Sequence, residues 1–402
     1  MALIASTSGV RRQKIVVCHE GHENDEGYAE NIFEFLVGRG IDHEFRHLGT
    51  PFTLDELARY QADGRNIALL GFNAQVDHAW IDKQPLVAVA GRYDITVMQW
   101  ILDHPSSRWP EFKCSDPTTS RFLFHSPYSQ AYFEKFCCKG AITATTGSIG
   151  PNGRSRSNVD GFAAFSRRPI TCIIALNMAR LGVSAAETEA SIVALDPALA
   201  ETLRQAIAQA RFDLDQPMEI HLTTALADSR LVLDSATFNR CFRLLNDTVQ
   251  HFRRAHIFRI ASRFGVLIQS DATARSLIGA GPSDFRQDVG TPQTLTSLRL
   301  CRAVLSVSPV NDSIHDRTCN ALNAGCLPIL EDNHAHRGLF THGENALLFR
   351  YEDDSIAACL ELACGDPAGI HAMAQRAKAM RDNGRFRFGL FGNIVNVARG
   401  GA

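Results

Sequence analysis

The chain has 402 residues, 45% of them hydrophobic, which is enough for two domains with separate buried cores. Its formal net charge of −2 excludes a general attraction to nucleic acid or to an anionic membrane, and no run of about 18 consecutive apolar residues predicts a membrane-spanning helix. The eleven cysteines are scattered without a Cys-x-x-Cys pair, which favours reduced thiols in a cytoplasmic protein over a disulfide framework or a zinc site.

Strands and helices alternate along the first part of the chain. Short apolar runs bounded by turn residues are typical of buried parallel strands, and apolar residues at helical spacing predict the helices between them. Thr53 and Glu56 form a predicted capping box for one of these helices. The predicted elements are a strand at 14–18, a helix at 28–37, a weak strand signal at Phe45 and Leu48, a helix at 53–61 and a strand at 66–72. This alternation predicts a doubly wound parallel sheet.

The segment after the first strand, residues 19–26, is polar and contains His19, a second histidine and several carboxylates. Histidines and carboxylates are ligands for divalent metal ions, but their spacing here matches no ordered metal motif. We therefore predict a solvated loop at the edge of the active site, with His19 as a candidate general base and no metal.

Two further strands, predicted at 96–102 and 121–125, place histidines at their carboxyl ends. The first is followed by Asp103 and His104, and the second ends in His125. Ligands of open α/β sheets bind at this edge, and a carboxylate can orient an imidazole, so all three residues are candidate bases. The alternative for the Asp-His-Pro sequence is a simple turn, which aspartate and proline both favour.

A Gly- and Pro-rich loop at 147–155 follows a strand predicted at 141–145 and lacks the Gly-Lys ending of a phosphate-binding loop. It is interpreted as a hinge, an acceptor-side loop or a linker. The polar stretch through Arg168 is the natural domain boundary. A strand predicted at 169–176 opens the second sheet, and a helical insertion follows at about 178–263, with apolar stripes that are typical of core packing.

The third part of the chain alternates again and is organised around residues 303–333. Ser313 and Asp316 fit a capping box for a helix at 314–324, and Gly325 is placed to end it in the left-handed conformation. The predicted elements are a strand at 266–269 followed by Asp271, a helix at 291–302, strands at 303–307 and 326–330 around that helix, a strand at 343–349 and helices at 354–363 and 370–380.

The helix at 314–324 is unusually polar for one that packs on a sheet. Arg317 and Asn320 are three residues apart and share a face. A helix N-terminus with an arginine in its first turn, at the carboxyl end of a parallel strand, favours binding of a diphosphate. Asp312 and His315 flank the same turn.

The run DRTCNALNAGCLPILEDN at 316–333, followed by LFTHGENALLFRYEDDSIAACLELA at 339–363, resembles the donor half of GT-B glycosyltransferases. In the retaining branch, two Glu residues bind the ribose and sugar hydroxyls of the donor. Their positions fall on Asp312 and Asn320, so both depart from the pattern. His315-Asp316-Arg317 with Asn320 is more similar to the CgeB-like group, which also has a strand ending in Asp-His-Pro.

The resemblance implies a GT-B fold of two Rossmann-like domains: an acceptor domain at 1–165, a donor domain at 166–385 and a C-terminal segment, 386–402, that crosses back to the first domain. It implies transfer of a sugar from a nucleotide-sugar donor to an unknown glycan, lipid or protein acceptor in the cleft between the domains, without metal or cofactor. The donor-binding candidates are Asp312, His315, Arg317, Asn320, Gly325 and Asp271.

Two other interpretations remain open on the sequence. A non-catalytic GT-B-like protein with a structural or regulatory role is favoured by the replacement of both signature Glu residues. An NAD-dependent enzyme is disfavoured, because no Gly-x-Gly-x-x-Gly follows the first strand and the segment there is acidic where a pyrophosphate would bind.

Overall fold

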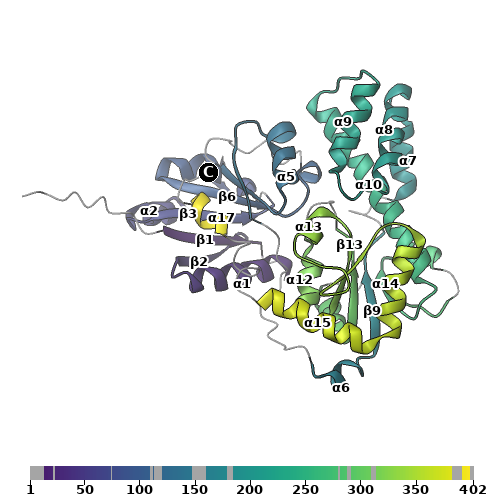
Figure 1. Cartoon of the computed structure of the whole chain (residues 1–402). Coiled ribbons are helices and arrows are strands. Elements are labelled where there is room, and N and C mark those ends of the chain that lie inside the picture. The colour runs from purple at the N-terminus through teal and green to yellow at the C-terminus, as the bar shows by residue number, and fades with distance from the viewer. Residues whose placement is uncertain are drawn as a thin grey trace, which may run out of the picture.

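Two parallel six-stranded sheets form the centres of the molecule (Figure 1). The computed structural model describes residues 13–20, 23–73, 75–108, 112, 120–146, 160–178, 184–278, 281–287, 291–308, 314–382 and 392–398. Helices cover both sheets, and the central strands are apolar runs that are buried on both faces, as expected for parallel sheets, whereas the edge strands β2, β8 and β11 are more exposed. The architecture is GT-B, and it confirms the predicted α/β class with two doubly wound sheets.

The first sheet has the strand order β2-β1-β3-β6-β7-β8. Its direction of winding reverses between β1 and β3, so the carboxyl ends of these strands flank the crevice where doubly wound sheets bind ligands. The strands are β1 (Gln13–His19), β2 (Asp42–His47), β3 (Asn66–Phe72), β6 (Ile95–Ile101), β7 (Ser120–Phe124) and β8 (Ile142–Thr145), and a small hairpin pairs β4 (Trp80–Ile81) with β5 (Gln84–Pro85).

Short helices connect these strands. Thr53 caps α2 by accepting a hydrogen bond from the Glu56 N–H at 3.1 Å, but the Glu56 carboxylate binds Arg46 instead of returning to Thr53, so only half of the predicted capping box forms. The helical segments are α1 (Glu23–Gly38), α2 (Leu54–Ala62), η1 (Gln75–His78), α3 (Leu86–Ala90), η2 (Gly91–Tyr93), η3 (Pro105–Arg108), α5 (Pro127–Tyr132), the π-helical turn η4 (Phe133–Cys137) and α6 (Phe162–Phe165).

The second sheet has the order β11-β10-β9-β12-β13-β14, with its reversal between β9 and β12. Its strands are β9 (Ile170–Ala175), β10 (Leu267–Ser270), β11 (Asp284–Gln287), β12 (Cys301–Ser306), β13 (Leu327–Glu331) and β14 (Leu347–Phe349). The helical segments around it are η5 (Ala272–Leu277), α11 (Thr291–Arg299), α12 (Asp316–Asn323), α13 (His334–Arg337), α14 (Asp353–Gly365) and α15 (Pro367–Asp382).

Four helices between β9 and β10 form a separate bundle beside the second sheet (Figure 1). They are α7 (Ala185–Val193), α8 (Pro197–Ala210), α9 (Met218–Asp228) and α10 (Ser235–Ala261). Apolar side chains of these helices pack into a core of their own, which also includes Tyr132 of α5. The apolar stripes of the sequence are therefore core packing.

The long helix α10 connects the two sheets. Its C-terminal half packs with the core of the second sheet, where Ile257 and Phe258 are fully buried. Its N-terminal half contacts the first domain, where the Phe242 ring stacks on His104 with centroids 4.6 Å apart and Asn239 accepts a 2.9 Å hydrogen bond from the Tyr132 hydroxyl. The insertion is thus a bridge between the two domains.

The last described helix, α17 (Gly392–Ala398), returns to the first sheet (Figure 1). Ile394, Val397 and Ala398 are buried in the same apolar cluster as residues of β1 and α1. Within the part of the chain that the structure describes, no helix combines the length and apolarity that crossing a bilayer requires.

Several element boundaries differ from the sequence predictions. The loop predicted at 19–26 is too long, because α1 already begins at Glu23. The helix predicted from 314 begins at Asp316 with His315 as its N-cap, so the proposed Ser313 capping box is wrong. The helix predicted to run to 302 ends at Arg299, since the chain enters β12 at Cys301. The short edge strand β11 had no apolar run to reveal it.

Candidate active site

The N-terminus of α12 lies at the carboxyl edge of the second sheet. His315 caps the helix through Nδ1, which accepts from the Arg317 N–H at 3.1 Å, and the same ring contacts the Asp316 carboxylate. The first contact needs a lone pair on Nδ1 and the second needs a proton there, so the tautomer of the His315 ring selects between them. Gly325 ends the helix with φ of 66°, as predicted for a left-handed C′ residue.

The polar face of α12 carries a charged and a neutral hydrogen-bonding group. Arg317, in the first turn, is half-buried, and Asn320 is buried one turn later. The Asn320 Oδ1 atom has no hydrogen-bond partner among the residues that the structure describes. A buried amide oxygen without a partner is unfavourable unless a bound molecule or water satisfies it, so this face is a candidate binding surface.

A hydrogen bond connects α12 to the first domain. The Tyr28 hydroxyl, on α1, donates to Asp316 Oδ2 at 3.3 Å. Burial raises the pKa of Tyr28 well above its ordinary value, and the charges of Asp316 and Asp103 raise it further. Burial alone would raise the pKa of Asp316, but His315 and Arg317 outweigh it and hold that pKa below its ordinary value. Tyr28 therefore lies within electrostatic range of carboxylates from both domains.

We expect Tyr28→Phe to weaken the contact between the domains, because it removes the donor to an ionised carboxylate. A double-mutant cycle with Asp316→Asn, measured by chemical denaturation, should give a coupling free energy of about 1.5 kcal/mol, the lower end of the range for hydrogen bonds to a charged group. Additive effects of the two substitutions would contradict the contact.

Asp103 is held at the end of β6 by an asparagine that the sequence did not indicate. Asn73 follows β3 with a φ of 46°, a conformation that asparagine tolerates better than most residues. Its Oδ1 accepts the N–H groups of Leu102 at 2.8 Å and Asp103 at 3.2 Å, and its Nδ2 donates to Asp103 Oδ2 at 3.3 Å. The Asp103 carboxylate is thus oriented at the carboxyl edge of the first sheet.

The three predicted histidines of the first domain occupy different surroundings. His19 ends β1 with its ring 5.4 Å from that of His47. His104 is buried between the rings of Tyr132 and Phe242, and its Nδ1 accepts the Ser106 N–H at 3.2 Å. His125 is buried, and its Nδ1–H donates to the Ile101 carbonyl at 3.3 Å. Aromatic packing therefore holds the His104 ring, and a hydrogen bond to the backbone holds the His125 ring.

Of the remaining predicted site residues, the structure describes Asp271, which follows β10 in the second sheet. Asp271 caps η5 by accepting the Thr273 N–H at 3.0 Å. Asp312 and the loop at 147–155 lie outside the described residues. Among the residues that are described, no group of three or more His, Cys, Asp or Glu side chains has the geometry of a metal site.

Two buried residues near α12 were missed by sequence reasoning. Glu331 ends β13, and its carboxylate accepts the Ser308 N–H and the Tyr351 hydroxyl, both at 2.7 Å. His336 is fully buried on α13, its Nδ1–H donates to the Glu331 carbonyl at 2.7 Å, and its Nε2 has no partner within the described part of the chain. In the sequence, the only indication of Glu331 and His336 is the short polar stretch that follows the strand predicted at 326–330.

His336 should make stability depend on pH. Burial lowers the pKa of His336 from 6.5 to about 4, so the unfolded chain binds the proton first as the pH falls. The free energy of unfolding should therefore decrease between about pH 6.5 and pH 4, by about 3 kcal/mol from this residue. Urea denaturation of His336→Gln should show a flatter pH dependence, whereas the exposed neighbour variant His334→Gln should keep the wild-type slope.

A family model matches part of the chain, within the second sheet and the helices around it. Residues 253–384 match the model of a family described as glycosyl transferase-like. This segment contains the C-terminal part of α10, β10 to β14, α12 and both closing helices. No curated protein sequence matches the chain.

Solved structures with a similar backbone fold have low sequence identity to this chain. The Anabaena protein Alr3699/HepE in complex with UDP and glucose is 10% identical with a TM-score of 0.47, covering 96% of this chain and 98% of that one. Sucrose-phosphate synthase from Thermosynechococcus elongatus is 11% identical with a TM-score of 0.49, covering 97% and 98%. A glycosyltransferase from Rickettsia africae is 8% identical with a TM-score of 0.45, covering 97% and 98%.

Proposed function

We propose that this chain is a glycosyltransferase with the GT-B fold, which transfers a sugar from a nucleotide-sugar donor to an acceptor bound between its two domains. The observation that supports the proposal best is the position of Arg317 and Asn320, three residues apart on α12, a helix that begins at the carboxyl edge of the second sheet. The acceptor domain is proposed at 1–165 and the donor domain at 166–385. The segment at 386–402 is proposed to return to the first domain, and the burial of Ile394 among residues of β1 and α1 supports this.

The donor diphosphate is proposed to lie at the N-terminus of α12. The positive end of the helix dipole and the Arg317 guanidinium would stabilise the negative charge that grows on the leaving group. Asn320 Oδ1 would accept a hydrogen bond from a donor hydroxyl, which would satisfy a buried oxygen that otherwise has no partner in the described structure. Asp312, His315 and Asp271 are proposed as further donor contacts. Gly325 was predicted as a donor contact too, but it ends α12 at the opposite end of the helix, where it lets the chain turn towards β13.

The helix dipole and Arg317 together would supply the electrostatic stabilisation that a divalent ion supplies in other enzymes. We therefore propose that transfer is independent of metal and needs no cofactor beyond the nucleotide sugar.

On the acceptor side, Asp103 is the proposed proton acceptor for a reaction that inverts the anomeric carbon. Its carboxylate is oriented by Asn73 and lies near Tyr28, which in turn contacts α12. His19 is the second choice, since it ends the strand at the reversal of the first sheet. His104 and His125 are proposed to support this edge, because their rings are buried in packing contacts.

We also propose a CgeB-like subgroup and a cytoplasmic location. The subgroup rests on His315-Asp316-Arg317 followed by Asn320. The location rests on the cysteines, which are free thiols throughout the described residues.

A thermal-shift screen tests the donor assignment. The full chain would be heated with UDP, GDP, CMP, dTDP, ADP and NAD, each with and without Mg²⁺. A ligand that binds only the folded protein raises the melting temperature by mass action. We therefore expect one nucleoside diphosphate to raise the melting temperature of this protein in the absence of Mg²⁺. A flat response to every nucleotide would favour a non-catalytic protein, and a response to NAD alone would favour an oxidoreductase.

A further inference from the structure

The turn after α12 leaves two backbone carbonyls that need donors from elsewhere. The turn is a Schellman motif, in which the Gly325 N–H donates to the Leu322 carbonyl at 3.2 Å. The Cys326 N–H donates to the Ala321 carbonyl at 2.9 Å and completes the motif. The carbonyls of Ala324 and Gly325 accept neither of these hydrogen bonds, so their donors come from outside the helix.

Arg168, which lies two residues before β9, supplies these donors. Its Nη2 donates to the Ala324 carbonyl at 3.3 Å, and its Nη1 donates to the Gly325 carbonyl at 3.4 Å. Nη1 also donates to the carbonyl of Cys301, at the start of β12, at 2.8 Å. The guanidinium therefore joins the end of α12 to the strand that precedes this helix, and its positive charge lies at the negative end of the helix dipole.

Arg168 is itself held in one orientation by the segment at 160–168, through which the chain enters the second domain. Asp160 Oδ2 accepts hydrogen bonds from Nε at 3.1 Å and from Nη2 at 2.8 Å. The guanidinium lies over the Phe165 ring, 5.0 Å from its centre, and the arginine is only 9% exposed. His371, on α15, donates through Nε2 to the Asp160 carbonyl at 2.8 Å. These contacts fix the guanidinium relative to the second domain.

The helix α12 depends on its surroundings for its position. It has eight residues, and helices this short are unstable in isolation. Several of its residues are poor helix formers, namely Thr318, Cys319, Asn320 and Asn323. Apolar packing against the sheet has no preferred direction, so the hydrogen bonds at the two ends set the position of the helix along its axis. These ends are about 12 Å apart, so a shift at the Arg168 end also moves Arg317.

We infer that Arg168 is a positioning residue of the donor site. It fixes the C-terminal end of α12 and thereby places Arg317 and Asn320, nearer the other end of the helix, for binding of the nucleotide sugar. The inference rests on the proposed function, which puts the donor at the N-terminus of α12. Arg168 lies a helix length away from that point, so it acts through α12 and not by contact with the substrate.

Arg168→Met tests the inference, because methionine keeps an apolar contact with Phe165 and removes every donor. Hydrogen exchange of the full chain, measured by mass spectrometry at a temperature at which all variants are folded, should be at least about tenfold faster in the amides of 316–326. The nucleoside diphosphate found by the thermal-shift screen should bind about tenfold more weakly. The value of kcat should fall by about 10- to 100-fold, the cost of displacing a positioned group by about 1 Å.

Two milder variants should have graded effects. Arg168→Lys keeps the positive charge but loses the planar fork, so it can reach fewer of the carbonyls. It should recover part of the nucleotide affinity that Arg168→Met loses. Asp160→Asn leaves the guanidinium in place without its charged partner, and it should weaken nucleotide binding by about threefold, since a neutral hydrogen bond is weaker than a charged one.

Arg46→Met is the matched control for the loss of Arg168. Arg46, in the first domain, has the same kinds of partner: its Nε donates to the Glu56 carboxylate at 2.8 Å. Its Nη1 and Nη2 donate to the carbonyls of His47 at 2.7 Å and Pro51 at 3.0 Å. The control should lower the melting temperature but leave the exchange of α12 and the nucleotide affinity at wild-type values.

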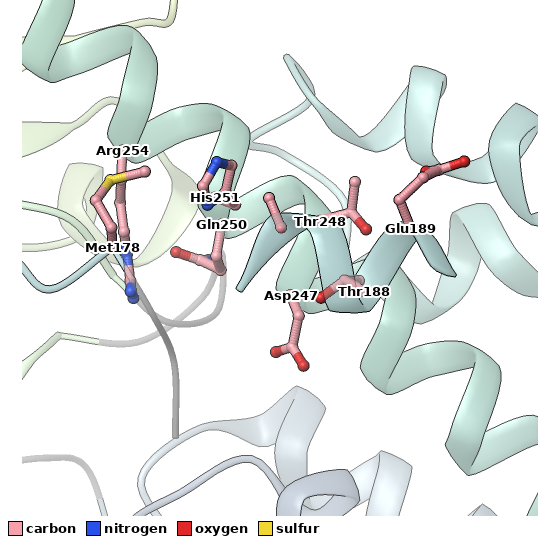
Figure 2. Close-up of a pocket in the computed structure, with 9 residues that line it drawn as sticks. Met178, Thr188, Glu189, Asp247, Thr248, Gln250, His251 and Arg254 are labelled. Carbon is pink, nitrogen blue, oxygen red and sulfur yellow. The ribbon is translucent and has the colours of Figure 1, made fainter. Parts of the chain in front are cut away.

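Glu189→Gln is the control for Asp160→Asn. The Glu189 carboxylate also binds an arginine, Arg204, at 3.1 Å. Figure 2 shows the Glu189 side chain beside a pocket of the helical insertion. Because this ion pair joins two helices of the insertion, its loss should change neither the exchange of α12 nor the binding of the nucleotide.

Exchange and binding together decide the inference. It is wrong if the amides of α12 exchange in Arg168→Met at the wild-type rate, or if this variant binds the nucleotide as tightly as Arg46→Met does. Either result would leave the proposed function intact, because the wild-type protein would still bind the nucleotide. A wild-type protein that no nucleotide stabilises would overturn the proposed function, and the exchange of α12 alone would then decide whether Arg168 positions this helix.

Discussion

Arg317→Ala should abolish the stabilisation that a nucleoside diphosphate gives the protein and should lower kcat/KM for transfer by about 100- to 1000-fold. The guanidinium is in the first turn of α12 and would be the fixed positive charge beside the leaving diphosphate. Because this charge acts most strongly when the sugar–phosphate bond breaks, the loss should be greater in kcat than in substrate binding. Differential scanning fluorimetry and a transfer assay with the donor from the nucleotide screen measure the two effects.

The control for this substitution is Arg299→Ala. Arg299 is exposed in the last turn of α11, within the same domain, so it reports the effect of losing one positive charge away from α12. It should keep the wild-type nucleotide response and rate. Equal melting temperatures of Arg317→Ala and wild type without nucleotide would show an intact fold. A normal nucleotide response in Arg317→Ala would refute the donor assignment.

Arg253→Met should lower the free energy of unfolding by about 3 to 5 kcal/mol, the usual cost of removing one member of a buried charged cluster. Arg253 is fully buried on α10, and its Nη1 lies 3.8 Å from Glu331 Oε1. Without the arginine, the Glu331 carboxylate remains buried with only its hydrogen bonds to Ser308 and Tyr351. Burial already raises the pKa of Glu331, and loss of Arg253 should raise it further.

The same arginine also holds the turn after α8. Its guanidinium donates to the carbonyls of Ala210 at 2.9 Å, Arg211 at 3.1 Å and Asp213 at 2.9 Å. These carbonyls lose their donor in Arg253→Met, so the insertion and the second sheet should come apart more easily. Local hydrogen exchange in α8 and β13 should therefore increase together.

Arg243→Met is the matched control, because Arg243 is exposed on the same helix. Guanidinium denaturation should give it a stability within about 0.5 kcal/mol of the wild type. Adding Glu331→Gln to Arg253→Met should recover part of the loss, since it removes the unpaired charge. A purely additive double variant would show that the two charges do not interact.

Local patterns in the sequence determined most of the fold. Apolar runs with turn residues at their ends specify a buried parallel strand by themselves, and β3 coincides with the predicted 66–72. Gly325 was recognised because a left-handed φ is far easier for glycine than for other residues. The polar face of α12, with Arg317 and Asn320, was also visible in the sequence, because a helix that packs on a sheet rarely has charged and amide side chains at this spacing.

Contacts between distant segments were decided only by the tertiary structure. Tyr28 was an ordinary residue of a predicted helix until folding placed its hydroxyl 3.3 Å from Asp316. Asn73 gained its role from the neighbouring strand end that it holds at Asp103. Periodicity reports which face of an element is buried but not which element covers it, and these contacts join residues from different elements.

The same reason explains the start of α12 and the role of the insertion. Ser313 and Asp316 had the spacing of a capping box, yet the helix begins at Asp316 with His315 as its cap. The apolar stripes of the insertion specified helices, but Arg254 and Gln250 reach the ends of β9 and β12 only because α10 lies across the second sheet. The sequence alone determined the strands, the helices and the polar face of α12, whereas the groups that surround that face were set by long-range packing, which no local pattern encodes.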